Sequence, residues 1–160
     1  MKKGIMTILV VGLLLLTGCK DEQNKISASP MPTQKSNMET LTIYSIDSDS
    51  MSLIPVVIKK QKETYTAEYI TYLVTQNLED EDVRIDHVEQ QKDTVFVSFS
   101  SKGKPVKGCS KEMETLILNC FASSLLDNAV NCENIIYRCE DKAYRSENRT
   151  FKRNQIYASE

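Results

Sequence analysis

A chain of 160 residues has room for one domain once a leader and a linker are set aside. Hydrophobic residues make up 41% of the chain and charged residues 26%, a balance that argues against disorder throughout. Without Lys2 and Lys3, 18 basic residues face 22 acidic ones, so the net charge is −4. A mildly acidic protein is a poor nucleic-acid binder, because binding phosphates requires a basic surface.

The first eighteen residues are typical of a bacterial signal peptide. Lys2 and Lys3 precede an almost purely apolar run from Ile5 to Leu16. A run of about a dozen apolar residues is too short for a permanent membrane-spanning helix, which needs about 20. We therefore predict that residues 1–18 are a leader that is removed from the mature chain.

The end of this run resembles a bacterial lipobox. Residues 15–19 read LLTGC and fit that pattern at every position, with Leu16, Thr17 and Gly18 as the signal-peptidase recognition residues. The thiol of Cys19 can take a diacylglyceryl group, and two acyl chains give a stable anchor where one chain binds only marginally. We expect a lipid anchor at Cys19 on the extracytoplasmic face of the cell membrane. The alternatives are an ordinary secretory leader and a plain transmembrane anchor.

A polar segment follows the lipobox. Between Lys20 and Thr40 the chain consists mainly of Ser, Asn, Gln, Lys, Pro and Met, with neither a helical nor a strand period. This composition favours a disordered tether, and a flexible chain of about 20 residues has a mean reach on the order of 25 Å. Residues 19–40 are therefore expected to hold a folded domain, residues 41–160, off the membrane surface.

The folded domain is expected to open with two strands and a helix. Leu41–Ile46 alternates apolar and polar residues, and Leu53–Lys59 follows a turn-forming cluster. Pro55 cannot donate to a ladder, so the second strand is expected at a sheet edge or as an irregular strand. A charged segment, 59–63, then leads to a helix that begins between residues 64 and 66 and ends near residue 78, because apolar residues recur there at three- and four-residue steps.

Tyrosines and carboxylates around this helix are open to two interpretations each. Tyr65, Tyr69 and Tyr72 could form an aromatic binding stripe, but their spacing favours the half-buried margin of a core face. The acidic run 79–82 could bind a cation. Its spacing matches no calcium loop and it contains no glycine, so we predict a solvated loop.

A hairpin is predicted next, from Val83–Val88 and Thr94–Phe99, with a turn at residues 90–93. His87 is the single histidine of the chain. Side chains alternate along a strand, so Asp86 is expected on the opposite face from His87. On that basis the two residues should not form the acid-histidine half of a catalytic triad.

A basic loop and a second helix follow. The segment 100–108 lacks the Gly-Lys-Ser/Thr ending of a phosphate-binding loop. Ser110 is predicted to cap a helix that runs to Leu126, with a single buried face at the helical spacing of residues 113, 116, 117, 120, 121, 124 and 125. A strand at Asn134–Arg138 and a turn at residues 140–141 come next. Residues 144–160 are expected to add an edge strand or to form a loose tail.

Four cysteines remain after Cys19, and disulfides are permitted in an exported protein. One interpretation places Cys120 and Cys139 in the core as small hydrophobes and leaves Cys109 and Cys132 as free thiols. Helix length restricts disulfides to the pairs Cys109–Cys139 and Cys120–Cys132. A zinc site is the third alternative, although no Cys-x-x-Cys pair is present.

The element order predicts an α+β fold with a small mixed sheet of about four to six strands and two helices packed on one face. Five segments in this order carry a family pattern: Leu41–Tyr44, Leu53–Val56, Thr94–Ser100, Thr115–Leu116 and Ile135–Tyr137. Behind a lipobox and a polar linker, they resemble the GerM domain family of sporulation and germination lipoproteins, over roughly residues 41–145. The chain departs from the family in having Glu140-Asp141 in place of the usual glycine after the last strand, and in its cysteines.

The resemblance implies a non-enzymatic scaffold that binds other proteins through sheet edges and helix faces, in the envelope of a Gram-positive bacterium. The family is similar to ring-building modules, so a homo-oligomer is among the implied partners. The residues agree with a role other than catalysis, because one histidine, two glycines in the mature chain and no paired carboxylates on a shared face leave little for an active site. We expect no cofactor, no metal and no nucleic-acid partner. A cell-wall- or solute-binding lipoprotein is the alternative, and an enzyme is a third class.

Overall fold

A computed structural model of the chain describes residues 38–61 and 64–160. The predicted leader, the lipobox residues Leu16, Thr17, Gly18 and Cys19, and the tether as far as residue 37 lie outside the described residues. The described elements, in chain order, are β1 (Met38–Asp47), β2 (Ser52–Gln61), α1 (Ala67–Asn77), a 3-10 turn (Glu79–Glu81), β3 (Ile85–Gln91), β4 (Thr94–Phe99), α2 (Lys111–Asn128), β5 (Asn134–Cys139), β6 (Lys142–Ala143) and β7 (Ile156–Ser159).

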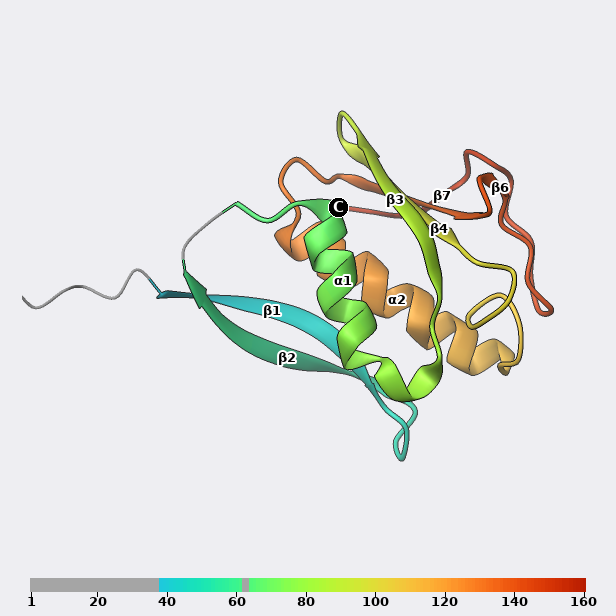
Figure 1. Cartoon of the computed structure of the whole chain (residues 1–160), viewed down its shortest axis with the longest axis horizontal. Coiled ribbons are helices and arrows are strands. Elements are labelled where there is room, and N and C mark those ends of the chain that lie inside the picture. Colours follow the sequence, from blue (N-terminus) through green and yellow to red (C-terminus); the bar gives the residue numbers. More distant parts are fainter. Residues whose placement is uncertain (1–37, 62–63) are drawn as a thin grey trace, which may run out of the picture. The chain divides into compact units, whose positions relative to one another are not determined.

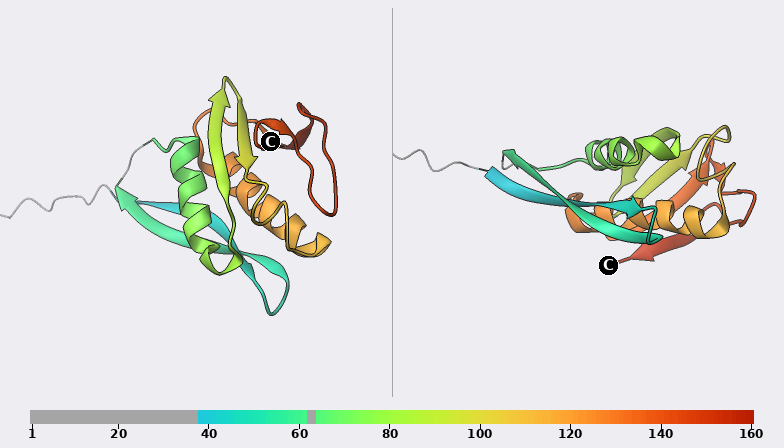
Figure 2. Two further views of the ribbon diagram at one scale, coloured as in Figure 1. Left: turned by 45° about the vertical axis from the view of Figure 1, so that its right-hand side comes forward. Right: turned by 90° about the horizontal axis from the view of Figure 1, so that it is seen from below.

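The predicted α+β class is confirmed. The strands form two sheets in the described part of the chain: a β1–β2 ribbon, and a five-stranded sheet in the order β3-β4-β5-β6, with β7 pairing β5 as well. β4 and β5 run parallel, and the other neighbours are antiparallel. Figure 1 shows the β3–β4 hairpin beside α1, and Figure 2 shows the ribbon standing apart from the larger sheet.

The β1–β2 ribbon is longer than the sequence pattern indicated. β1 begins at Met38, so the last three residues of the expected tether belong to the sheet, and β2 continues past Lys59 to Gln61. Glu39 lies opposite Lys60 in the ladder, and opposite charges on facing strands stabilise the pairing. Each strand of a two-stranded ribbon has a free edge, which is where Pro55 is tolerated.

Helix α1 begins at Ala67, one residue after the predicted range 64–66, and ends at Asn77. The Thr66 hydroxyl accepts a hydrogen bond from the Tyr69 backbone N–H at 3.3 Å and so caps the helix. The buried Tyr65 stacks on Tyr69 with 5.7 Å between ring centroids, as expected for the margin of a core face. The interpretation is wrong for Tyr72, which is 57% exposed.

The second helix is the centre of the fold. Ser110 caps α2 by accepting a hydrogen bond from the Met113 N–H, as predicted, but the helix continues to Asn128. The predicted buried face is confirmed and is wider than expected, because Glu114 is buried within it and Leu118 and Ala122 extend it around the helix. A buried stripe this wide lets the helix contact elements on two sides.

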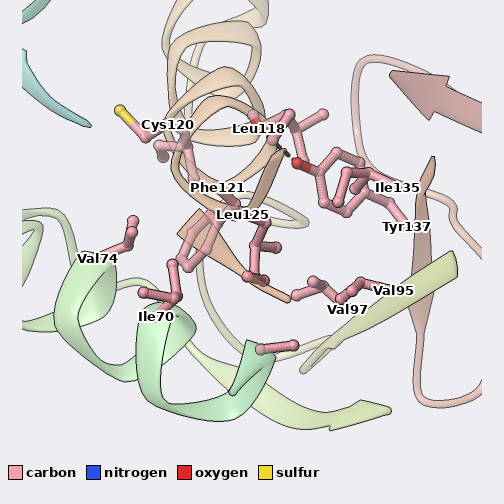
Figure 3. Packing of buried hydrophobic residues seen from close by; sticks show 14 of the residues in the cluster. Ile70, Val74, Val95, Val97, Leu118, Cys120, Phe121, Leu125, Ile135 and Tyr137 are labelled. Atoms are coloured by element: carbon pink, nitrogen blue, oxygen red, sulfur yellow. Dashed lines mark hydrogen bonds between the residues drawn. The ribbon is translucent and has the colours of Figure 1, made fainter. Parts of the chain in front are cut away.

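Both sheets hold α2 by hydrogen bonds as well as by apolar contact. From the ribbon, the Tyr44 N–H donates to the Ser124 hydroxyl at 2.9 Å, and Asn128 Nδ2 donates to the Thr42 carbonyl at 2.7 Å. From the five-stranded sheet, the Tyr137 hydroxyl donates to the Leu118 carbonyl, which Figure 3 shows at the centre of the core. The helix therefore fixes the ribbon relative to the larger sheet.

The core joins α1, α2, β4 and β5. Its buried members include Ile70, Val74, Val97, Phe121 and Leu125, which lie close together in Figure 3. An aromatic cluster extends it, since the Phe99 ring contacts the rings of Phe121, Tyr137 and Tyr144 at centroid distances of 5.6, 5.5 and 6.1 Å.

The C-terminal segment belongs to this fold. β7 pairs with β5, so the expected edge strand is confirmed and the loose tail is wrong. Tyr144 is fully buried, and its hydroxyl donates to the Glu114 carboxylate at 2.8 Å. The Tyr157 hydroxyl donates to Asn119 Oδ1 at 2.6 Å. Residues 144–157 are thus bound along α2.

Candidate functional site

A groove of about 670 Å³ lies between α1 and the segment that leads into β3. From α1 it is lined by Glu68, Thr71, Tyr72 and Thr75, and from the opposite side by residues 83–88 and Ser100. Volumes of about 300–1,000 Å³ are typical of ligand sites in proteins. The volume of the groove falls within this range.

The lining of the groove combines apolar and polar groups. Val83, Ile85 and Val88 contribute apolar surface, and Thr71 contributes a hydroxyl. Thr71 is 3% exposed, and its Oγ1 has no hydrogen-bond partner in the described part of the chain. A buried polar atom without a partner costs free energy, so this hydroxyl would be stabilised by a polar group entering the groove.

At the β3 end of the groove, His87 lies between two carboxylates. Its Nδ1 is 3.2 Å from Asp86 Oδ2, and its Nε2 is 2.8 Å from Asp141 Oδ1. The expectation that Asp86 and His87 face opposite sides is wrong. Ile85 pairs with Phe99 and His87 with Ser98, so Asp86 is the extra residue of a β-bulge, and a bulge re-aims side chains.

The turn between β5 and β6 brings Asp141 to His87. Glu140 and Asp141 have positive φ angles of 47° and 61°, as in a tight hairpin turn, which confirms the turn expected there. The Asp141 N–H donates to the Ser98 hydroxyl at 3.0 Å, and the Ser101 hydroxyl donates to the Glu140 carboxylate. That hydrogen bond from Ser101 lowers the pKa of Glu140.

The Asp86–His87–Asp141 row does not by itself present a nucleophile. Within residues 38–61 and 64–160, no hydroxyl or thiol forms a hydrogen bond with His87. The arrangement can hold a proton or a metal ion between nitrogen and oxygen, and it can bind a donor group from a ligand.

Two ion pairs involve the acidic run 79–82, and one of them joins it to the basic loop 100–108. Lys104 Nζ lies 2.8 Å from Glu81 Oε2, and Arg84 Nε lies 3.1 Å from Asp82 Oδ1. Glu79, Asp80 and Asp82 are exposed, as predicted for a solvated loop. These two ion pairs leave Glu79 and Asp80 of the acidic run, and Lys102 and Lys107 of the basic loop, without an ion pair among the described residues.

All four cysteines of the folded domain are free thiols. Cys120 and Cys132 are buried, whereas Cys109 and Cys139 are half-buried, so Cys132 takes the core position that the sequence assigned to Cys139. Burial raises the pKa of Cys120 to about 12 and that of Cys132 to about 11. Burial also raises the pKa of Cys139, with smaller contributions from the Glu140 and Asp86 carboxylates.

These pKa values predict the order in which the thiols react. Only the thiolate is nucleophilic, so at pH 8 about one Cys132 side chain in a thousand is reactive, and Cys120 still fewer. We expect iodoacetamide to label Cys109 and Cys139 of the native protein first, and Cys120 and Cys132 only in denaturant. Peptide mass spectrometry of the Cys19→Ala protein measures this order.

The same experiment tests the disulfide alternative. In denaturant without reductant, Cys109, Cys120, Cys132 and Cys139 should all be alkylated. A pair that is labelled only after reduction would contradict the free-thiol state.

Sequence reasoning missed two residues of this region. Thr71 is a polar residue on the α1 face that also carries Ile70 and Val74, and a hydroxyl among buried apolar neighbours was the available signal. Asp141 was recognised only as a turn residue. Its approach to His87 depends on strand pairing and could not be inferred from spacing.

No helix within the described residues is both long enough and apolar enough to cross a membrane. The fold defines the molecule as a small α+β domain with an open groove between α1 and residues 83–88. No family model matches the chain, and no curated protein matches it.

A solved structure of the tandem GerMN domains of the sporulation protein GerM from Bacillus subtilis is similar to this chain, with 13% sequence identity and a TM-score of 0.41. The alignment covers 82% of this chain and 51% of the other, so the chain spans about half the length of that structure. A likeness at this level carries no conclusion about function.

Proposed function

We propose that this protein is a lipoprotein anchored through Cys19 on the extracytoplasmic face of the membrane, and that its folded domain binds a protein partner without catalysing a reaction. The lipobox at residues 15–19 supports the location. The groove between α1 and β3 supports the binding role, because it is open and lined by both apolar and charged side chains. The Asp86–His87–Asp141 row beside it offers no nucleophile among the described residues.

A place in sporulation or germination rests on the sequence resemblance to the GerM domain family. Under this proposal the partner lies in the cell envelope. It is either another protein or a second copy of this chain. A lipid anchor and a flexible tether confine the domain to a thin layer above the membrane, which raises the effective concentration of any partner in that layer.

A second candidate, a cell-wall- or solute-binding lipoprotein, is favoured by the buried hydroxyl of Thr71. A small ligand that enters a groove of about 670 Å³ could offer this hydroxyl the hydrogen-bond partner that it lacks. Small-molecule sites are typically apolar with a few placed polar groups, and this lining fits that description.

Photo-crosslinking in intact cells tests the first proposal. A photo-reactive amino acid at Tyr72, which lies in the groove, is expected to give an adduct of defined mass with an envelope protein. Val57 is the matched control, since its side chain is 60% exposed on β2 and does not line the groove. Crosslinking from both positions alike, or from neither, would contradict binding at the groove.

Native mass spectrometry of the uncrosslinked protein, purified from membranes, separates the two candidates. If the occupant of the groove is a protein, the chain is expected to carry no bound small molecule. A bound small molecule that is lost in a Thr71→Val variant would instead support the solute-binding candidate.

A further inference from the structure

We infer that His87 and Asp141 form a binding site for a divalent transition-metal ion, oriented by Asp86. This inference goes beyond the proposed function and does not depend on it. The three residues come from the β3 bulge and the β5–β6 turn, and one potential ligand atom from each lies within 4.8 Å of the others.

The chemistry of imidazole makes the row of three side chains incomplete without a cation. A neutral imidazole has one N–H and one nitrogen lone pair. Both ring nitrogens of His87 face a carboxylate oxygen, at 3.2 Å and 2.8 Å, so in the neutral form one contact brings a lone pair against a negative charge. Either a second proton or a metal ion relieves this repulsion.

The distance between Nε2 and Asp141 suits two ligands of one ion. Zinc lies about 2.0–2.1 Å from a histidine nitrogen and about 2.0–2.2 Å from a carboxylate oxygen. Neighbouring ligands of such an ion are therefore about 2.9–3.4 Å apart. The observed separation is 2.8 Å, so a shift of less than about 0.6 Å would admit the ion.

Asp86 is placed to orient the histidine. Its carboxylate lies 3.2 Å from Nδ1 and is placed to accept a hydrogen bond from Nδ1–H; in that tautomer the Nε2 lone pair faces Asp141. Metal-bound histidines generally have such a carboxylate or carbonyl partner, and its loss typically weakens metal binding about 10–100-fold. The side chain of Asp86 is a positioning group here, and Nε2 of His87 and the Asp141 carboxylate are the ligands.

The surrounding charges favour a cation at this position. His87 is the only basic side chain within ion-pair distance of Asp86 or Asp141 in residues 38–61 and 64–160. The nearby bases Arg84 and Lys104 pair with Asp82 and Glu81 instead. Two carboxylates thus share one imidazole, and a divalent ion compensates their charge.

The ligand set selects the class of metal. Calcium takes six to eight oxygen ligands, whereas imidazole suits zinc, copper, iron and nickel. The side chains of His87 and Asp141 are 38% and 57% exposed, so coordination positions remain open to water. Asp86 and His87 also line the groove, where a bound ligand could fill one of those positions.

The test uses the fact that the chain has a single histidine. Zinc chloride is added to the ¹⁵N-labelled Cys19→Ala protein, and the two imidazole nitrogens are followed by NMR. We expect saturable binding with a large shift confined to Nε2. Asp141→Asn should abolish the shift at the same zinc concentration, and Asp86→Asn should weaken binding about 10–100-fold.

Glu89→Gln, on the same strand, is the matched control and should bind as the unaltered protein does. Thermal unfolding of each variant confirms that it is folded. Zinc binding that leaves the His87 nitrogens unchanged would place the metal on the thiols and overturn the assignment. The assignment would also be overturned if the Asp141→Asn variant bound zinc as the unaltered protein does. It would be overturned equally if both ring nitrogens of His87 were protonated and remained so in millimolar zinc.

Discussion

Replacing Glu114 by alanine is expected to lower the free energy of unfolding by about 3 kcal/mol. Glu114 is fully buried in α2, and its Oε1 accepts hydrogen bonds from the hydroxyls of Tyr144 and Ser146, each at 2.8 Å. Arg149 Nε lies 3.3 Å from the same oxygen. Alanine would leave two donors and a charge without their acceptor, and removing one partner of a buried pair is strongly destabilising.

The expected value lies at the low end for buried pairs, because the Arg149 side chain keeps 20% exposure and can regain some water. Urea unfolding at neutral pH measures the change from the midpoint and slope. The free energy of unfolding of a Glu114→Gln variant should lie between those of the unaltered protein and the Glu114→Ala variant. The amide oxygen of glutamine can still accept a hydrogen bond from Tyr144, but it carries no charge.

The control for this prediction is Glu112→Ala, which alters an exposed carboxylate in the first turn of the same helix. This variant should change the free energy of unfolding by no more than about 0.5 kcal/mol. Equal destabilisation by the two alanine variants would show that the contacts of Glu114 contribute little.

Replacing Cys19 by alanine is expected to move the protein from the membrane fraction to the medium. The reason is that the thiol of Cys19 is the only atom of the lipobox that can carry the diacylglyceryl group, and without acyl chains the tether has no anchor. Immunoblotting of membrane and medium fractions, together with incorporation of a labelled fatty acid, measures the effect.

Cys109→Ala is the matched control, because it removes a thiol from the folded domain and leaves the lipobox intact. This variant should remain on the membrane and keep the label. If Cys19→Ala protein stayed on the membrane with the label, the lipobox interpretation would be wrong.

Most of the secondary structure follows from local patterns. The periods of the two helices, the cap Ser110 and the apolar β-branched and aromatic residues of β4 lie close together in the chain, so these features could be predicted. Pro55 correctly indicated a strand with a free edge. Boundaries were less accurate where cross-strand pairs, such as Glu39 with Lys60, extend a ladder beyond its apolar part.

The features that could not be predicted depend on contacts between distant segments. A glutamate on a helix is ordinarily read as exposed, and Glu114 is buried only because Tyr144, Ser146 and Arg149 fold back over α2. In the candidate site, the β-bulge arises from the register between β3 and β4. That register decides where Asp86 points, and strand alternation alone gave the wrong face.

The position of β7 has a consequence for when the domain can fold. Tyr157 supplies a ring 4.7 Å from that of Tyr137 and a hydrogen bond to Asn119, and Ser159 pairs with Asn134 at the start of β5. While these residues have not yet crossed the membrane during export, the aromatic cluster lacks the ring of Tyr157. Under the proposed location, the domain therefore reaches its native state only after residue 159 has crossed.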